Sequence, residues 1–262
     1  MPEEKRARRL VVVGDVHGQL DPFVKILQHA GLIDKQQNWI GGHERLLQMG
    51  DIFDRGPQAK EADALLDKIQ KQAALAGGEV IRLLGNHELE ILLSNFFMSG
   101  FDGVEAIHLR DKLTAQVAQG DLRGAYAYKG FLFTHAGVTH KLYKIFQAQL
   151  EDASAHNVAA LINLIFKESI KHQFFKHPIF NISLSRNGSN KFGGIFWEDL
   201  SDLAHSFTQS PLWQVVGHTQ VSHIVIDPVL QLIAVDVGLH RRMQYLVINE
   251  NNQPVICEVP AL

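Results

Sequence analysis

The chain of 262 residues is long enough for one large α/β domain with a sizeable core. Its formal net charge of -3 argues against nucleic acid as the main partner, and no apolar run reaches the length that crosses a membrane. The single cysteine, Cys257, is typical of a reducing compartment, and no secretory signal is recognised, so we expect a cytoplasmic protein. Residues 1–9 are expected to form a flexible tail, and residues 10–262 a single domain.

Short apolar runs alternate with longer amphipathic stretches from residue 10 onward, which is the pattern of strands and helices in a layered α/β fold. Asp21 and Pro22 predict the start of a first helix, as a capping carboxylate followed by proline, and Gly31 predicts its end. Another helix is predicted to follow Asn86. A further helix is expected within residues 62–73. Residues 141–194 are expected to form an insertion of helices and loop, with two helices within residues 141–171. Strands are predicted at 10–13, 46–49, 80–84, 131–134, 214–216, 224–226, 232–235 and 245–248.

Five of these predicted strands run directly into a turn that carries Asp, Asn or His. In an open α/β sheet the carboxyl ends of the strands meet one crevice, so we expect these side chains to converge. Carboxylate, amide and imidazole groups without thiolate suit divalent Mn, Fe or Zn. The side chains concerned are Asp15, His17, Asp51, Asn86, His135 and His218.

Six ligand side chains suggest two divalent ions, which at about 3.5–4 Å apart would share one carboxylate. Such a pair lowers the pKa of a shared water and holds a phosphoryl group for in-line attack. Arg55 offers a planar, permanently charged group for phosphate oxygens. His87 is expected to protonate the leaving oxygen, with Asp54 orienting its imidazole.

The motifs Gly-Asp-Val-His-Gly (14–18), Gly-Asp-Ile-Phe-Asp-Arg-Gly (50–56), Gly-Asn-His-Glu (85–88), His-Ala-Gly (135–137) and Gly-His (217–218) occur in this order. Together they resemble the motifs of the calcineurin-like metallophosphoesterases, in the phosphoprotein phosphatase branch, over residues 10–240. The resemblance implies an α/β fold of four layers, two mixed β-sheets flanked by helices. It also implies direct attack of metal-bound hydroxide on phosphorus, without a phosphoenzyme.

The resemblance further assigns the ligands to the two ions. Asp15 and His17 would hold the first ion and Asp51 would bridge both. Asn86, His135 and His218 would hold the second ion, with Asn86 also facing substrate. Arg186, the only arginine between the two late histidine motifs, is the candidate for a second phosphate-binding arginine.

Two departures from the eukaryotic Ser/Thr phosphatases make the chain resemble bacterial-type members, including the Shewanella-like phosphatases. Leu84 stands where those enzymes have arginine, and residues 234–240 lack their Ser-Ala-Pro-Asn-Tyr-Cys segment. Dinucleoside tetraphosphatases share the architecture but commonly lack the aspartate that matches Asp54.

The combination of Asp54, Arg55 and His87 therefore favours a phosphatase of phosphoserine, phosphothreonine or phosphotyrosine proteins, with Mn as the first choice of metal. A dinucleoside polyphosphate hydrolase and a metal-binding interaction protein without turnover are the alternatives.

Overall fold

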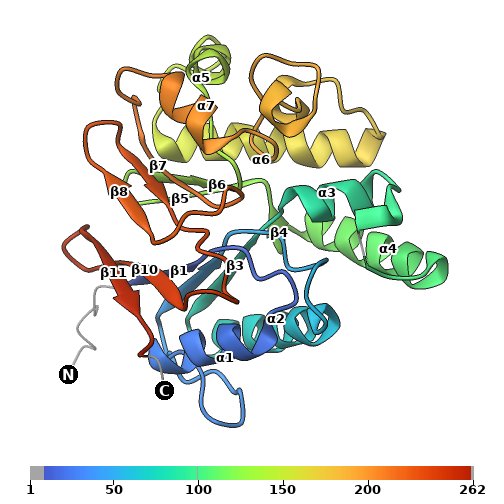
Figure 1. Cartoon of the computed structure of the whole chain (residues 1–262), viewed down its shortest axis with the longest axis vertical. Helices are drawn as coiled ribbons and strands as arrows, with labels where there is room; N and C mark the ends of the chain where they lie inside the picture. Colours follow the sequence, from blue (N-terminus) through green and yellow to red (C-terminus); the bar gives the residue numbers. More distant parts are fainter. Residues whose placement is uncertain (1–8, 99, 261–262) are drawn as a thin grey trace.

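Two mixed β-sheets form the centre of the protein, and helices cover their outer faces (Figure 1). The computed structural model describes residues 9–98 and 100–260, so the tail expected at residues 1–9 lies almost entirely outside the described residues. The first sheet has the strand order β11-β10-β1-β2-β3-β4, and the second has the order β5-β6-β7-β9-β8. The strands are β1 Leu10–Val13, β2 Arg45–Gln48, β3 Glu79–Leu83, β4 Leu122–Arg123, β5 Ala125–Tyr128, β6 Phe131–Thr134, β7 Trp213–Val216, β8 Val225–Asp227, β9 Leu232–Ala234, β10 Gln244–Ile248 and β11 Pro254–Glu258.

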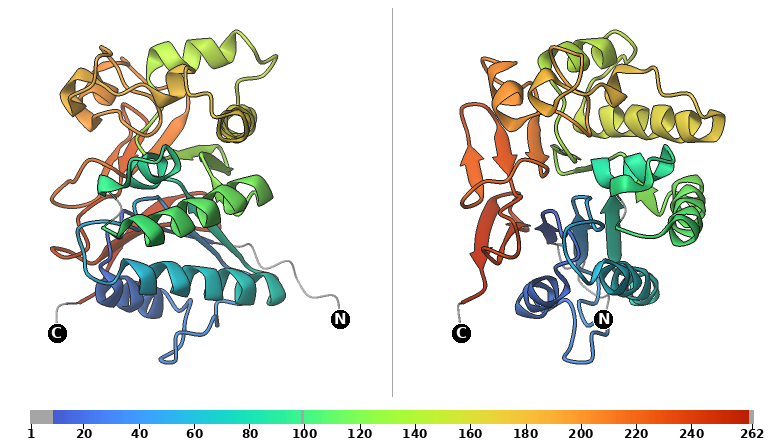
Figure 2. Two further views of the ribbon diagram at one scale, coloured as in Figure 1. Left: turned by 90° about the vertical axis from the view of Figure 1, so that its right-hand side faces the viewer. Right: turned by 45° about the vertical axis from the view of Figure 1, so that its right-hand side comes forward.

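The helices complete a four-layer sandwich, which confirms the fold implied by the motifs (Figure 2). Helices α1 (Leu20–His29) and α2 (Ala59–Leu75) lie on the outer side of the first sheet, and α2 packs against β3. Helices α5 (His140–Gln147), α6 (Ala155–His172) and α7 (Leu200–His205) lie beyond the second sheet. Because α6 packs against β5 and β6, the segment expected as an insertion supplies the fourth layer. Helices α3 (Asn86–Leu92) and α4 (Gly103–Gln119) pack against each other, and α4 also packs against β4.

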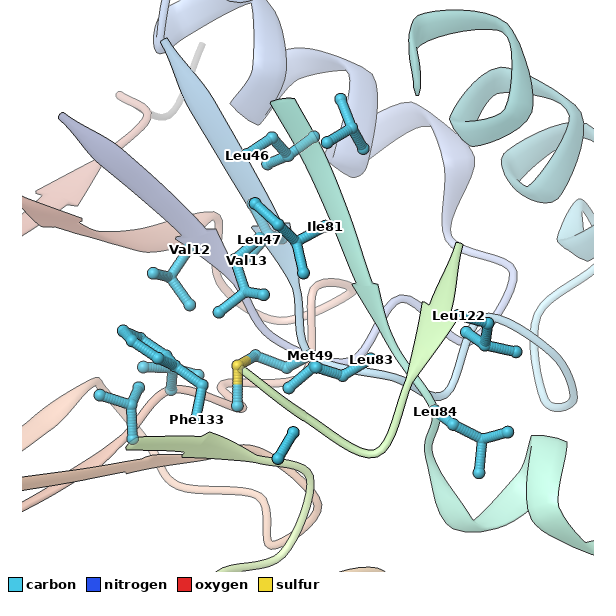
Figure 3. Packing of buried hydrophobic residues seen from close by; sticks show 14 of the residues in the cluster. Val12, Val13, Leu46, Leu47, Met49, Ile81, Leu83, Leu84, Leu122 and Phe133 are labelled. Carbon is cyan, nitrogen blue, oxygen red and sulfur yellow. The ribbon is translucent and has the colours of Figure 1, made fainter. Parts of the chain in front are cut away.

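The core lies between the sheets and under the helices. Every residue of β1 is buried, as is typical of a strand covered on both faces, and this explains its uninterrupted apolar sequence. Figure 3 shows Val13, Leu47 and Ile81 of the first sheet beside Phe133 of the second. Packing of the sheets against each other thus brings the ends of β1, β2 and β3 close to those of β6 and β7.

The predicted cap of the first helix is wrong. Helix α1 begins at Leu20, with Gln19 at the N-cap position and no side-chain cap. The backbone N–H of Phe23 already donates to the Gln19 carbonyl, at 3.2 Å, so the helical hydrogen bonds begin two residues before the expected cap. Asp21 therefore lies within the first turn, where its charge favours the positive end of the helix dipole.

Helices α4 and α7 and strands β4, β5 and β11 were not predicted. Of the 17 residues in α4 only Ala106, Leu113 and Val117 are buried, so the helix lacks a broad apolar face. Its ends did carry signals, since Asp102 accepts hydrogen bonds from the N–H groups of Val104 and Glu105 and Gly120 ends the helix. Within residues 9–98 and 100–260, the structure has no helix of the length and hydropathy that a membrane span requires.

Candidate metal centre

The six predicted ligands converge at the carboxyl ends of five strands. Asp15 and His17 follow β1, Asp51 follows β2 and Asn86 follows β3, all in the first sheet. The second sheet contributes His135 after β6 and His218 after β7. Five of these side chains are buried and His218 is half-buried. The site therefore lies where the ends of the two sheets meet.

Backbone carbonyls orient two of the imidazoles. His17 Nδ1 lies 3.0 Å from the Phe53 carbonyl oxygen, and His135 Nδ1 lies 2.9 Å from the Met49 carbonyl oxygen. Because a carbonyl only accepts hydrogen bonds, each Nδ1 must carry the proton. Each ring then presents the lone pair of Nε2 to the site, as a metal-binding histidine does.

The Nε2 of His135 faces oxygens that have no hydrogen to donate to it. Asn86 Oδ1 is 3.1 Å away and Asp51 Oδ2 is 3.5 Å away, and His218 Nδ1 lies at 3.2 Å. Burial lowers the pKa of His135, so the ring does not gain a second proton near neutral pH. Lone pairs that converge in this way fit a cation among them.

Asp51 belongs to both groups of side chains that are arranged to hold an ion. One group is His17, Asp51 and His87, and the other is Asp51, His135 and His218. Asp51 Oδ2 lies 3.5 Å from His17 Nε2, whereas the nearest oxygen of Asp15 lies 4.0 Å from that nitrogen. This arrangement fits the bridging role expected of Asp51. It also places His87, expected to act as an acid, closer to the first group than the sequence indicated.

Burial and neighbouring charges set the protonation of the site. Burial lowers the pKa of His17 to about 4 and that of His218 well below its usual value, so both imidazoles are neutral at pH 7. Burial alone would raise the pKa of Asp51, but the surrounding imidazoles, His135 first, hold it below its usual range. Burial and the neighbouring carboxylates Asp236 and Asp51 raise the pKa of Asp15 well above its usual value.

Two further carboxyl groups share this region. Burial, with Asp51 as a like charge, raises the pKa of Glu88 and of Asp236 to about 6. When ionised, Asp15, Asp51, Glu88 and Asp236 carry four negative charges, which two divalent ions would balance. The residues present therefore fit a pair of divalent ions in both donor chemistry and charge.

His87, Asp54 and Arg55 lie together beside Asp51. His87 Nδ1 is 3.1 Å from Asp54 Oδ2, although the angle between the groups is not that of a hydrogen bond. The Asp54 side chain is 30% exposed, so its carboxylate has room to rotate and align with the imidazole. Arg55 Nη2 lies 3.4 Å from His87 Nε2, and the Arg55 side chain is exposed to solvent. The expected acid and the expected phosphate-binding arginine are thus adjacent.

Arg186 is the last residue of the short helix Leu184–Arg186 and lies near the turn that carries His218. Its Nη2 donates to Thr219 Oγ1 at 2.5 Å and pairs with Asp199 at 3.0 Å. Thr219 directly follows His218, and the positive charge of Arg186 contributes to the low pKa of His218, after burial and His135. The structure therefore brings Arg186 to the site, beside the His218 turn.

Glu88 is a site residue to which the sequence analysis gave no role, although it lies within the motif at 85–88. Its carboxylate accepts hydrogen bonds from the backbone N–H groups of Asp51 at 2.8 Å, Ile52 at 2.8 Å and Gly85 at 2.9 Å. It thereby joins the turns after β2 and β3. A side chain at Gly85 would approach Asp51 Oδ1 to 2.0 Å, so only glycine allows these turns to lie so close.

Comparison with curated proteins finds relatives that match part of this chain. Shewanella-like protein phosphatase 2 of Arabidopsis thaliana is 33% identical over 105 residues, 40% of this chain and 27% of that protein. Shewanella-like protein phosphatase 1 of Plasmodium berghei is 38% identical over 89 residues, 34% of this chain and 24% of that protein. The symmetrical bis(5'-nucleosyl)-tetraphosphatase of Pseudomonas syringae is 27% identical over 132 residues, 48% of this chain and 40% of that protein. The matched part thus spans less than half the length of each of these relatives.

Among solved structures, the cold-active protein-tyrosine phosphatase of a psychrophilic Shewanella species shares the fold. It superposes with a TM-score of 0.61 at 19% identity, over 95% of this chain and 80% of that one. The family model for calcineurin-like phosphoesterases matches residues 8–222, which contain all six predicted ligands. As the five ordered motifs predicted, the chain belongs to the calcineurin-like phosphoesterase family.

Proposed function

We propose that the chain is a phosphomonoesterase that depends on two divalent metal ions and acts mainly on phosphorylated proteins. The observation that carries the proposal is the placement of His87, Asp54 and Arg55 directly beside an Asp51 carboxylate shared by two ligand groups. This combination provides a metal centre, a phosphate-binding cation and a proton donor within one site. Two of the curated relatives are named protein phosphatases, which supports the same substrate class.

The protein groups have separate roles in this proposal. Asp15, His17 and Asp51 would hold one ion, and Asp51, Asn86, His135 and His218 the other. Such a pair of ions, Mn first and Fe or Zn as alternatives, lowers the pKa of water and offsets the charge of the phosphoryl group.

The remaining groups act on the substrate itself. Arg55 and Arg186 would bind phosphoryl oxygens, and Asn86 would also contact the substrate. His87 would carry a second proton as the imidazolium and donate it to the oxygen that leaves, which returns the ring to its neutral form. Asp54 would orient the charged ring and stabilise it before the transfer, through its 3.1 Å contact.

The surface around Arg55 fits a substrate that continues on both sides of its phosphate group. Arg55 lines a cavity of about 570 Å³ together with Asp54, Lys60 and Phe101. It also lines a cavity of about 240 Å³ together with His17 and His240. A phosphorylated residue within a polypeptide has chain on both sides, so these two cavities support a protein substrate.

A dinucleoside polyphosphate is the second candidate substrate, because a relative carries that name. Its two nucleobases would need flat apolar surfaces on which to stack. In the described part of the chain, the residues that line the cavity beside His17 include no phenylalanine, tyrosine or tryptophan. This composition favours the protein substrate.

The test is phosphate release by Mn-loaded protein from matched phosphotyrosine and phosphoserine peptides, with diadenosine tetraphosphate as the third substrate, whose cleavage is followed by the mononucleotides it forms. We expect faster turnover of a peptide, and the peptide that is preferred identifies the class of phosphorylated residue. Preferential cleavage of the dinucleotide would overturn the protein-substrate proposal and keep the hydrolase. No turnover of any of them, with the ions bound, would favour a metal-binding interaction protein.

A further inference from the structure

A sixth strand also ends in a polar residue at the metal centre. Strand β9 runs parallel to β7 in the second sheet, and Ala234 pairs with Val216. His218 lies two residues beyond Val216, and Asp236 lies two residues beyond Ala234. The backbone N–H of Val221 donates to the Asp236 carbonyl at 2.8 Å, which fixes the two turns to each other. Asp236 therefore occupies the same edge of the sheet as the ligand His218.

The backbone of Asp236 also packs against the turn that carries Asp15. A Cβ atom placed on Gly14 would lie 2.6 Å from the Val235 carbonyl oxygen and 3.0 Å from Asp236 Cα. Asp15 in turn accepts a hydrogen bond from the backbone N–H of His218, at 3.1 Å. Asp236 is thus enclosed by the segments that provide a ligand from each sheet.

One oxygen of the Asp236 carboxylate has no partner within the described residues. Oδ1 accepts a hydrogen bond from the Gly238 N–H at 2.9 Å, whereas Oδ2 is buried without a hydrogen-bond donor. The residue as a whole is only 1% exposed, and among the described side chains no ion pair joins it to Arg55 or Arg186. A buried carboxylate oxygen is costly unless a cation or a donor lies against it.

We propose that Asp236 is a further residue of the metal centre and provides negative charge and a lone pair to the cation on the Asp15 side. The inference rests on the proposed function, because it assigns a residue to the same centre. A purely structural role for Asp236 in the turn would need only the contact of Oδ1 with Gly238, whereas the proposed role needs the charge and Oδ2.

The Asp236→Asn variant separates these two roles. Asparagine has nearly the same volume and keeps the oxygen that accepts from Gly238, but it lacks the charge. The matched control is Asp227→Asn, since Asp227 accepts hydrogen bonds from the backbone N–H groups of Val229 and Leu230 in the same sheet, both at 2.9 Å. Mn²⁺ binding to each metal-free full-length protein would be measured by titration calorimetry, with free Mn²⁺ followed by electron paramagnetic resonance.

Wild type and Asp227→Asn are expected to bind two Mn²⁺ per chain. Asp236→Asn is expected to bind at least one of them about 10- to 100-fold more weakly, the usual effect of losing a group that supports a metal site. In EDTA, its melting temperature should equal or exceed that of wild type, because an unpaired buried charge is removed.

The Asp236→Ala variant is a second test. It removes both the charge and the contact to Gly238, and it should weaken Mn²⁺ binding as much as Asp236→Asn does. Unchanged Mn²⁺ affinity in both variants would overturn the inference and leave the proposed function intact. Failure of the wild type to bind Mn²⁺ would instead overturn the proposed function, and this inference with it.

Discussion

At the scale of single residues, backbone conformations with positive φ angles orient several side chains of the site. His17, Asp51, Asp54, Arg55 and His218 all have positive φ angles, between 44° and 68°. Each such angle costs on the order of 1 kcal/mol for a residue other than glycine, so surrounding contacts must hold it. The hydrogen bonds from Asp51 and Ile52 to Glu88 are contacts of this kind. The site is therefore preorganised before substrate binds.

The assignment of His87 as proton donor predicts a loss that depends on the leaving group. An alkyl phosphate expels a poor leaving group that needs a proton, whereas a nitrophenyl phosphate hardly needs one. The His87→Asn variant should hydrolyse a phosphoserine peptide about 10²- to 10⁴-fold more slowly and lose much less activity on p-nitrophenyl phosphate. Because His87 also lies in a group with His17 and Asp51, the Mn²⁺ content must be measured as the control. Equal losses on both substrates would contradict the assignment.

At the scale of elements, the sequence predicted the strands that end in ligands better than the elements around them. Strands β1, β2, β3, β6 and β7 were found because each is an apolar run that stops at a turn with Asp, Asn or His, and because this construction recurs five times. Helix α4 was missed because its contacts with α2 are polar, as in the Lys112 pairs with Asp63 and Asp67. Asp236 was given no role because one aspartate between two valines is uninformative until the pairing of β9 with β7 places it beside His218.

We expect truncation of Arg82 in β3 to cause a large loss in the free energy of unfolding. Its guanidinium is buried and pairs with Asp63 at 2.6 Å and Asp67 at 2.7 Å, both on α2. Arg82→Ala leaves Lys112 as the only cation paired with these carboxylates among the described residues, and it should lower the free energy of unfolding by about 3 kcal/mol, at the low end for a broken buried pair. Urea unfolding would measure the loss. Arg110→Ala, which removes an exposed pair with Asp111, is the control and should change little. A loss for Arg82→Ala no larger than that of the control would contradict a stabilising role for the pairs of Arg82 with Asp63 and Asp67.

Glu198, in the loop that follows Arg186, is expected to make the stability of the protein depend on pH. Its buried carboxyl accepts from the N–H groups of Gly193 and Asp199, and burial raises its pKa to about 7 from the usual 4.5. The folded state then binds this proton more tightly than the unfolded state, so the contribution of Glu198 to stability is greatest below pH 4.5 and declines up to pH 7. The melting temperature of wild type relative to Glu198→Gln should therefore fall between pH 4.5 and 7.5. A constant difference would show that folding does not raise the pKa of this carboxyl.

At the scale of the whole molecule, the candidate metal centre is built from both sheets. Asp15, His17, Asp51 and Asn86 follow strands of the first sheet, and His135 and His218 follow strands of the second. The sheets also share one apolar core, so they are expected to unfold together. Ions held from both sides would bind the folded chain alone, because unfolding separates the two sets of ligands. Their binding free energy is then added to the stability of the entire fold.

This linkage predicts that Mn²⁺ raises the melting temperature of the whole protein and that Asp51→Asn abolishes most of the increase. At 100 times the dissociation constant, one ion adds about 2.7 kcal/mol. For a chain of this size, that corresponds to roughly 5–10 °C above the value in EDTA. Asp51 serves both ligand groups, so its loss should weaken both ions, whereas Asp227→Asn should keep the full shift. Calorimetry with and without Mn²⁺ measures the shift. If Asp51→Asn kept two tightly bound ions and the full shift, Asp51 would not be the bridge, and the two ligand groups would have to be independent.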